Sequence, residues 1–293
     1  MDSPLVSICI QTYQHAAFIQ KTIESVLMQK TDFPLEILIG EDESNDGTRE
    51  ICIDYAKKYP DVIRLFLNER KNVIYVDGKP TARWNFINNM EHARGKYVAL
   101  LPGDDYWTYP LKLKKQVDFM EQNPAYAFCF HNAARIDSNG NNLNDPFCDI
   151  DMETRDVSIY EFFEKNLNPT CSVVYRKSAI SSLPYARNIR AYDWFLNILA
   201  GEKGKIRYFN ETWGVLRVHQ GGVWQSMNVT DRIEAEYKVL KNIDIYFNRK
   251  YRKYILPSKI LRKSQVANFY LRDRKFIKYF RNYLTILFLR LFK

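Results

Sequence analysis

The first hundred residues alternate between two hydrophobic periods. Continuous apolar runs have the length of buried strands, and apolar residues between these runs recur at helical spacing. The predicted strands span residues 5–10, 35–39, 63–67 and 97–101. The predicted helices span residues 18–29, 48–59 and 81–93. Strands that alternate with helices predict an α/β fold with a mostly parallel, Rossmann-like sheet that is flanked by helices on both faces.

The alternation loosens after residue 101. The elements predicted there are helices over 110–122 and 193–200, and strands over 125–133, 172–175 and 206–209. From residue 231 onward the sequence is helical in pattern, basic and aromatic to its end. We therefore expect a main domain over residues 1–225 and a helical, basic and aromatic C-terminal extension over residues 226–293.

The positive charge of the chain is concentrated at its end. The whole sequence carries a net charge of +9, while residues 247–293 hold fourteen Lys and Arg against one acid, Asp273, and so carry +13. The first 246 residues therefore carry −4. The mildly acidic charge of these 246 residues disfavours nucleic acid as a partner, although the net charge of the whole chain would favour nucleic acid.

The basic tail has two interpretations. Lys and Arg interleaved with Tyr, Phe, Leu and Ile are typical of an amphipathic helix on a membrane surface. The same pattern also suits helices that pack on the body and expose a solvated basic face. The longest apolar run of the tail, residues 283–289, is far shorter than the ~20 residues that span a bilayer.

The cysteines indicate a reducing compartment. Five cysteines are scattered along the chain, without a CxxC pair or a Cys/His spacing suited to zinc. The N-terminus leads directly into the first predicted strand, without the pattern of a secretion signal. We therefore expect a cytoplasmic protein, which is peripheral on the inner face of the plasma membrane if its tail binds lipid.

Polar clusters follow three of the predicted strands. They occupy residues 11–14, 41–44 and 103–105. Ligands of doubly wound sheets lie at the carboxyl ends of the strands. Paired carboxylates such as Asp104 and Asp105 suit Mg²⁺ or Mn²⁺, and a bound cation would let an acidic body hold a nucleotide diphosphate. The sequence has neither a P-loop nor a GxGxxG motif, which disfavours kinase-like and dinucleotide-binding sites.

Several stretches carry a resemblance to a known family. VSICIQTYQHAAFIQKTIESVLMQ, EILIGEDESNDGT and GKYVALLPGDDYW resemble the family-2 inverting glycosyltransferases of the GT-A fold, and the resemblance extends over residues 5 to about 225. PLKLKKQVDFMEQNP and YDWFLNILAGEKGKI are similar to a bacterial subgroup that builds surface polysaccharides. The resemblance implies that residues 1 to about 106 bind a nucleotide sugar and that residues 107–225 form the acceptor side.

The resemblance also implies how the donor nucleotide is bound. Asp42 matches the carboxylate that recognises the base, and Tyr13 matches the aromatic ring that packs on the base. The backbone around Gln11 and Thr12 would complete the contacts to base and ribose. Glu41, beside Asp42, belongs to the same donor-binding cluster.

The metal and the diphosphate are assigned to a second group of residues by the same resemblance. Asp104 and Asp105 match the metal motif, with Asp105 as the first choice for a direct ligand to Mn²⁺ or Mg²⁺. Arg217 and His219 match a late motif that contacts the diphosphate or the metal. His219 is also interpretable as a surface histidine at a strand end.

The acceptor side depends on Asp193, which matches the catalytic base. A helix N-cap is the alternative role for this residue, because it opens an apolar helical run. Asn85 and Arg83, on the helix before the fourth strand, are expected to touch the nucleotide. Trp107 and Trp224 either stack on sugars or pack in the core.

Three positions depart from the family pattern. Gln11 stands where Pro is usual, and Gln14 stands where Asn is usual. Gly103 replaces the first acid of the metal triplet, which leaves open how many protein ligands the metal has.

The expected activity is inverting transfer of a sugar from a nucleotide diphosphate sugar, with a UDP-sugar favoured, to a saccharide or lipid-linked saccharide during surface polysaccharide synthesis. The alternatives are a sugar nucleotidyltransferase and a non-catalytic binding module. A nucleotidyltransferase usually has a Gly-rich, Arg/Lys-bearing segment near its N-terminus, which residues 11–18 lack. A binding module would not require Asp42, Asp105 and Asp193 together.

Overall fold

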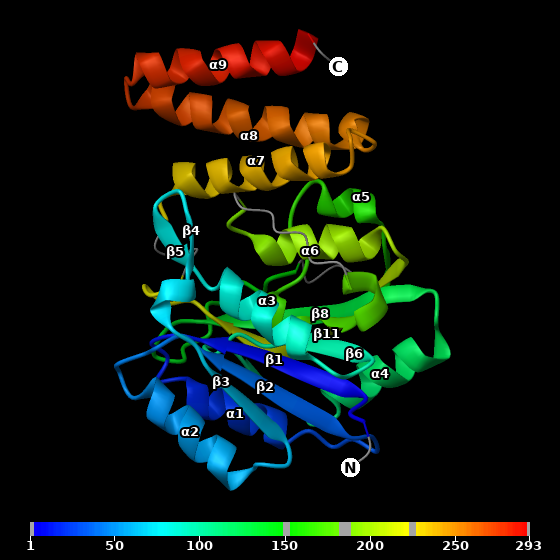
Figure 1. Cartoon of the computed structure of the whole chain (residues 1–293). Coiled ribbons are helices and arrows are strands. Elements are labelled where there is room, and N and C mark those ends of the chain that lie inside the picture. The colour runs from blue at the N-terminus through cyan, green and yellow to red at the C-terminus, as the bar shows by residue number, and fades with distance from the viewer. Residues whose placement is uncertain (1–2, 149–152, 182–188, 223–226, 292–293) are drawn as a thin grey trace. The chain divides into compact units, whose positions relative to one another are not determined.

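The computed structural model describes residues 3–148, 153–181, 189–222 and 227–291 (Figure 1). The chain forms two compact units that are discontinuous in sequence. The first unit comprises Met1–Ser158, Leu167–Leu183 and Leu199–His219. The second comprises Ile159–Asn166, Pro184–Ile198 and Gln220–Lys293. The division predicted at residue 225 stays a prediction, since these units group two segments from before that residue with the C-terminal helices.

Four parallel strands begin the sheet of the first unit. They are β1 (Val6–Thr12), β2 (Leu35–Glu41), β3 (Ile63–Leu67) and β6 (Tyr97–Leu100). They lie in the order β3-β2-β1-β6, with Val6 of β1 opposite Leu35 of β2 and Tyr97 of β6. Their centres are mostly apolar, as expected for strands covered on both faces. The strands and helices predicted over this part of the chain are confirmed.

Beyond β6 the sheet is mixed. The further strands are β7 (Tyr106–Trp107), β8 (Tyr126–Ile136), β9 (Arg155–Val157), β10 (Val174–Arg176) and β11 (Lys205–Arg217). The order continues β6-β10-β8-β11-β7, and β9 also pairs with β11. Strands β8 and β11 are parallel, while β10, β7 and β9 are antiparallel to their neighbours. The α/β sheet expected from the sequence is therefore present, with its antiparallel strands in the second half.

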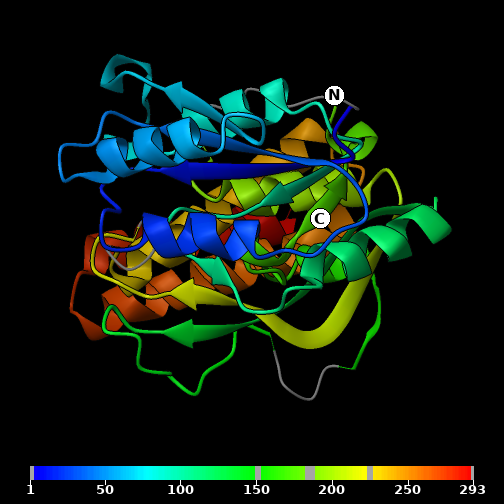
Figure 2. The same cartoon turned by 90° about the horizontal axis from the view of Figure 1, so that it is seen from below.

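Helices cover both faces of this sheet (Figures 1 and 2). Helices α1 (Ile19–Leu27) and α2 (Thr48–Lys58) lie on one face, and α3 (Arg83–His92) lies on the other. Helix α4 (Lys112–Gln122) contributes Leu113, Val117 and Met120 to the same apolar cluster as α1 and the strands. The buried side chains of this cluster come from alternate positions of β1 and from the i, i+4 spacing of α1, the two periods seen in the sequence.

Three local features differ from the prediction. The strand predicted over 206–209 is only the first part of β11, which has thirteen residues and contains register shifts. The strand predicted over 172–175 begins only at Val174, after a 3₁₀ turn at Thr170–Ser172. A small hairpin of β4 (Ile74–Val76) and β5 (Lys79–Thr81) was not predicted, because strands of three residues show no period.

The second unit is built from helices. They are α5 (Ile159–Phe162), the greater part of α6 (Tyr192–Gly201), α7 (Val229–Tyr246), α8 (Arg252–Arg272) and α9 (Phe276–Leu291). The predicted helical extension is therefore confirmed. Helix α8 lies between α7 and α9, and all three run side by side (Figure 1). Among the described residues, no helix is long and apolar enough to cross a membrane.

Ion pairs connect α7 to α8. Lys259 and Asp244 are both buried, and their Nζ and Oδ2 atoms lie 2.8 Å apart. Lys263 pairs with Glu234 at 2.7 Å, in the same helix pair. A large part of the positive charge of α8 is thus neutralised by acidic residues of α7.

The buried pair yields a prediction about stability. Lys259→Ala removes one partner and leaves the Asp244 carboxylate buried, with Arg252 at 3.4 Å as its remaining cation. We expect the free energy of unfolding to fall by about 3 kcal/mol, as when one member of a buried pair is deleted. Urea denaturation followed by circular dichroism measures this, with Lys241→Ala on the exposed side of α7 as control. Equal urea midpoints for the two variants would contradict the role of the pair.

Candidate active site

The carboxyl ends of β1, β2 and β6 lie side by side in the first unit. Backbone hydrogen bonds connect the segments that follow them. The Asp42 N–H donates to the Thr12 carbonyl at 3.1 Å, and the Gly103 N–H donates to the Gln11 carbonyl at 3.0 Å. The three polar clusters seen in the sequence are therefore neighbours, as expected for parallel strands that end at one edge.

A fourth segment reaches the same edge from β11. The short strand β7 pairs antiparallel with β11, so that Tyr106 lies opposite Val215. This pairing brings Asp104 and Asp105 beside Arg217 and the residues that follow it. The Arg217 N–H donates to Asp105 Oδ1 at 2.9 Å, and its Nε donates to the Asp104 carbonyl at 3.2 Å.

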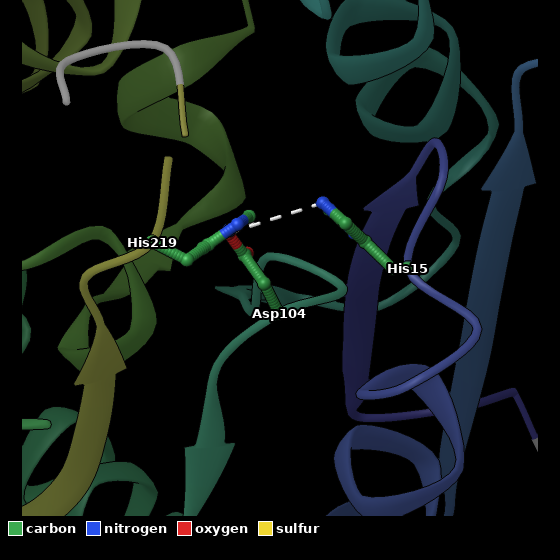
Figure 3. A group of neighbouring side chains, drawn as sticks. All are labelled: His15, Asp104 and His219. Atoms are coloured by element: carbon green, nitrogen blue, oxygen red, sulfur yellow. Dashed lines mark hydrogen bonds and ion pairs between the residues drawn. The ribbon is translucent and has the colours of Figure 1, made fainter. Parts of the chain in front are cut away.

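Two histidines converge on one aspartate (Figure 3). His219 Nε2 lies 3.0 Å from Asp104 Oδ2, and His15 Nε2 lies 3.9 Å from the same oxygen. One ligand atom of each residue lies within 4.8 Å of the other two. All three side chains are half-buried, so they are held in place and still accessible. We call these three residues the His–Asp–His cluster.

Gly103 explains how His15 reaches this cluster. A Cβ atom at residue 103 would lie 2.6 Å from Thr12 Oγ1 and 2.9 Å from His15 Nδ1, closer than real Cβ atoms come. Thr12 Oγ1 and His15 Nδ1 lie 3.2 Å apart and form a hydrogen bond that orients the ring. His15 and Thr12 therefore occupy the space into which a side chain at position 103 would project.

His15 was not predicted as a site residue. The sequence did contain a signal, since this histidine stands three residues after the end of β1, whose carboxyl end neighbours that of β6. Burial lowers the pKa of His15, and the nearby Asp104 opposes this effect. The imidazole therefore favours its neutral form, in which a ring nitrogen can bind a cation.

The two adjacent aspartates differ in environment. Burial by itself would raise the pKa of Asp104, but the hydrogen bond from His219 and the two imidazoles outweigh it and lower the pKa. Burial, and then the charge of Asp104, raise the pKa of Asp105 well above its ordinary value. Asp105 is almost fully buried and accepts the Arg217 N–H. The sequence ranked Asp105 first as a cation ligand, and the structure brings Asp104 together with the two histidines; the choice of ligand stays a prediction.

The predicted base-recognition residues form a second group beside β2. Asp42 is buried and accepts a hydrogen bond from Asn68 Nδ2 at 3.1 Å. Burial raises the pKa of Asp42 to about 6, although Asn68, Arg70 and Asn85 oppose the shift. Tyr13 is exposed on one side, and the Arg70 guanidinium lies 4.0 Å from its ring centroid.

Asn85 and Glu41 lie next to this group and hold the backbone around it in place. Asn85 Nδ2 donates to the Gly40 carbonyl at 2.7 Å and also contacts Asp42. Glu41 is fully buried, and its carboxylate accepts the Ser44 N–H and pairs with Arg49. The Glu41 side chain therefore stabilises the loop after β2 and is not available to a ligand. Neither Asn68 nor Arg70 was predicted, because both follow β3, where the sequence shows no acidic or glycine-rich motif.

The other predicted residues, Asp193 and Trp107, have hydrogen-bond partners of their own. Asp193 is on α6 in the second unit, where Asn166 Nδ2 donates to its Oδ2 at 3.3 Å. Its role as a base stays a prediction. Trp107 is buried and donates its Nε1–H to the Cys171 carbonyl at 2.6 Å, which indicates packing. Trp224 lies outside the described residues.

Comparison with known proteins identifies the fold and the family of this chain. Residues 7–183, more than half of the chain, match the model of glycosyl transferase family 2. Among solved structures, *S. aureus* TarS in complex with UDP-GlcNAc superposes with a TM-score of 0.60 at 16% identity, over 90% of this chain and 71% of that chain. The *Pyrobaculum calidifontis* mannosyltransferase PcManGT, in complex with GDP-Man and Mn²⁺, superposes with a TM-score of 0.55 at 14% identity, over 99% and 85% of the two chains.

Curated relatives agree with this placement. A *Mycobacterium tuberculosis* protein, Rv1520, is 34% identical over 78% of this chain, which spans only 62% of that relative. The dTDP-rhamnosyl transferase RfbG of *Shigella flexneri* is 24% identical over 83% of this chain and 80% of its own. The putative teichuronic acid biosynthesis glycosyltransferase TuaG of *Bacillus subtilis* is 36% identical over 43% of this chain and 46% of its own. The chain belongs to glycosyl transferase family 2, has the GT-A fold, and has relatives in bacterial polysaccharide synthesis.

Proposed function

We propose that this protein transfers a sugar, with inversion, from a nucleotide diphosphate sugar to a saccharide in the synthesis of a bacterial surface polysaccharide. The observation that carries the proposal is the His–Asp–His cluster, which shares one edge of the sheet with the Asp42 group. The names of RfbG and TuaG support the polysaccharide context, and the nucleotide-sugar complexes of TarS and PcManGT support the donor class. The acceptor is a saccharide, free or linked to a lipid.

The His–Asp–His cluster is the proposed site for a divalent cation. Its donors are one carboxylate oxygen from Asp104 and ring nitrogens from His15 and His219. Mg²⁺ prefers oxygen ligands, whereas imidazole also suits first-row transition metals, so this donor set fits Mn²⁺ better than Mg²⁺. A bound cation would supply Lewis-acid stabilisation of the departing diphosphate. The presence of Mn²⁺ in the PcManGT complex supports this choice.

The chain's own residues would position the donor around that site. Ionised Asp42 would accept a hydrogen bond from the imide N–H of a uracil or thymine base, and the open side of Tyr13 would pack on the ring. Arg217 would place its guanidinium near the diphosphate, because its Nε already contacts the backbone of Asp104. UDP is the favoured nucleotide, and a dTDP donor uses the same base contact.

Asp193 is the proposed general base. In an inverting transfer the acceptor hydroxyl loses its proton as its oxygen attacks C1 of the donor sugar, so that the C1–O bond to the diphosphate breaks. The proton would pass to the Asp193 carboxylate, and the electron pair of the broken bond would leave with the diphosphate. Membership of a glycosyltransferase family favours this activity over a sugar nucleotidyltransferase or a binding module.

One experiment tests the donor class directly. The melting temperature is measured with UDP-, dTDP- and GDP-sugars and with nucleoside triphosphates, each with and without Mn²⁺. We expect a nucleotide sugar to stabilise the protein only when Mn²⁺ is present, because a ligand that binds the folded state alone raises the melting temperature. Stabilisation by a triphosphate and by no nucleotide sugar would contradict the transferase.

The cluster predicts how substitutions change cation affinity. His15→Ala, Asp104→Asn and His219→Ala each remove one donor, and we expect each to weaken Mn²⁺ binding by at least about tenfold, or 1.4 kcal/mol. Calorimetric titration with Mn²⁺ and with Mg²⁺ measures this in the absence of donor. His92→Ala, at an exposed histidine of α3, is the matched control. Unchanged Mn²⁺ affinity in His15→Ala would remove His15 from the site.

The raised pKa of Asp42 predicts that the stability of the protein depends on pH. Because burial raises its pKa to about 6 from 3.8, the folded state holds this proton more tightly than the unfolded chain does. Stability is therefore lost as pH rises from about 4 to above 6, by up to about 3 kcal/mol for two pKa units. Asp42→Asn stays neutral, so we expect it to unfold at higher urea than the wild type at pH 7.5 and at a similar concentration at pH 4.

The same substitution should weaken UDP binding, since an amide cannot replace the ionised acceptor in the same orientation. UDP affinity of the wild type should also fall as pH drops through about 6. Asp61→Asn, at an exposed carboxylate, is the control for both measurements. A variant that binds UDP like the wild type at pH 7.5 would exclude Asp42 as a base-recognition residue.

Asp193→Asn separates binding from chemistry. We expect donor affinity to be unchanged and kcat to fall by about 10²–10⁴-fold, the usual contribution of a general base. Donor binding is measured by calorimetry and transfer by nucleotide release with an acceptor preparation. Asp273→Asn, at an exposed carboxylate of the tail, is the control. If Asp193→Asn transfers sugar at the normal rate, another residue is the base.

A further inference from the structure

Helix α9 has a second apolar face that no described residue covers. Asn282, Ile286 and Leu289 are buried and face α8. The large apolar side chains that remain exposed are Phe276, Ile277, Phe280, Leu284, Leu287, Phe288 and Leu291. Their spacing of three and four residues places them on one stripe, opposite the buried residues. We call this stripe the outer face of α9.

The exposure of this stripe is unusual for a water-facing helix. Ile277 is 88% exposed, Leu284 64% and Leu291 79%. Single exposed apolar residues are ordinary, but a contiguous apolar stripe marks an interaction surface. The helix thus has one apolar face for α8 and another for a partner.

Cations border the outer face on both sides. Lys278 and Arg281 lie along one edge, and Arg290 lies along the other at helical spacing. All three are exposed, and among the described residues no acidic side chain forms an ion pair with them. This contrasts with α8, whose Lys259 and Lys263 pair with acids of α7. The three exposed cations of α9 therefore border the outer face without an acidic partner among the described residues.

We propose that the outer face of α9 docks on the surface of an anionic lipid bilayer. The helix would lie in the plane of the interface, with its apolar stripe in the acyl boundary and its cations at the lipid phosphates. Its sixteen residues make a helix about 24 Å long, which suits lying on a membrane and is too short and too charged to cross one.

The chemistry of the stripe favours lipid over another copy of this chain. In a symmetric dimer the same face would meet itself, which brings Lys278, Arg281 and Arg290 of one copy close to those of the other. Asp273, before the helix, is the nearest acid in sequence, and it already pairs with Lys275. An anionic bilayer supplies both the apolar layer and the negative charge that the surface needs. The proposal does not depend on the transferase chemistry.

Co-sedimentation of the whole 293-residue chain with vesicles tests this directly. We expect binding to vesicles of phosphatidylcholine with phosphatidylglycerol and much weaker binding to phosphatidylcholine alone. Ile277→Glu/Leu284→Glu should lower binding to anionic vesicles by at least tenfold. Lys278→Gln/Arg281→Gln should lower it by about 30-fold, at roughly 1 kcal/mol per cation, and should reduce the dependence on salt.

Matched variants control for charge and exposure. Ile245→Glu changes an exposed apolar residue of α7, and Lys57→Gln/Lys58→Gln removes two exposed cations of α2. Both should bind vesicles like the wild type. All variants change exposed side chains, so circular dichroism should show unchanged folding.

Three outcomes would overturn the proposal. They are wild-type protein that stays in the supernatant with anionic vesicles, α9 variants that bind as well as the wild type, and a dimer in light scattering that Ile277→Glu/Leu284→Glu converts to a monomer without an effect on vesicle binding. Because no donor or acceptor is present, these outcomes are independent of whether the proposed sugar transfer occurs.

Discussion

The geometry of the site depends on a close approach of two backbone segments. The chain after β6 passes so near the loop after β1 that position 103 has no room for a Cβ atom. With the Thr12 and His15 side chains in these positions only glycine fits here, and the Gly103 N–H donates to the Gln11 carbonyl. As a result His15 stands beside Asp104.

This approach also separates the electrostatic roles of two neighbouring aspartates. The imidazoles hold Asp104 ionised, while burial favours the protonated form of Asp105. Two carboxylates this close repel each other when both are charged. The Arg217 N–H donates to Asp105 Oδ1, which fixes the end of β11 against the turn after β6. This contact positions His219, two residues later, beside Asp104. Asp105 therefore contacts the segment that carries His219 through the Arg217 backbone N–H.

The sequence predicted the elements better than the side-chain assignments, for physical reasons. Apolar runs and helical spacing determined the first four strands and their helices, because burial on both faces demands such patterns. The extent of β11 was missed because its exposed positions and register shifts interrupt any period. Which of Asp104 and Asp105 faces the cluster depends on the pairing of β7 with β11, more than 100 residues apart in sequence. His15 required knowledge of the contact at Gly103, which no local pattern contains.

The pairing of individual charges matters at the strand ends of the sheet and again in the C-terminal helices. The strand ends present Asp42 and Asp104, while Glu41 is neutralised by Arg49 and so adds little to the field at the surface. Such a site would repel an anionic diphosphate, and the cation proposed for the His–Asp–His cluster would reverse the local sign. In the tail, acids of α7 pair with Lys259 and Lys263 of α8, whereas among the described residues no acid pairs with the cations of α9. The net charge of the strand ends or of the C-terminal helices is therefore a poor guide to the ligand that each surface binds. The pairing of individual charges is the better guide.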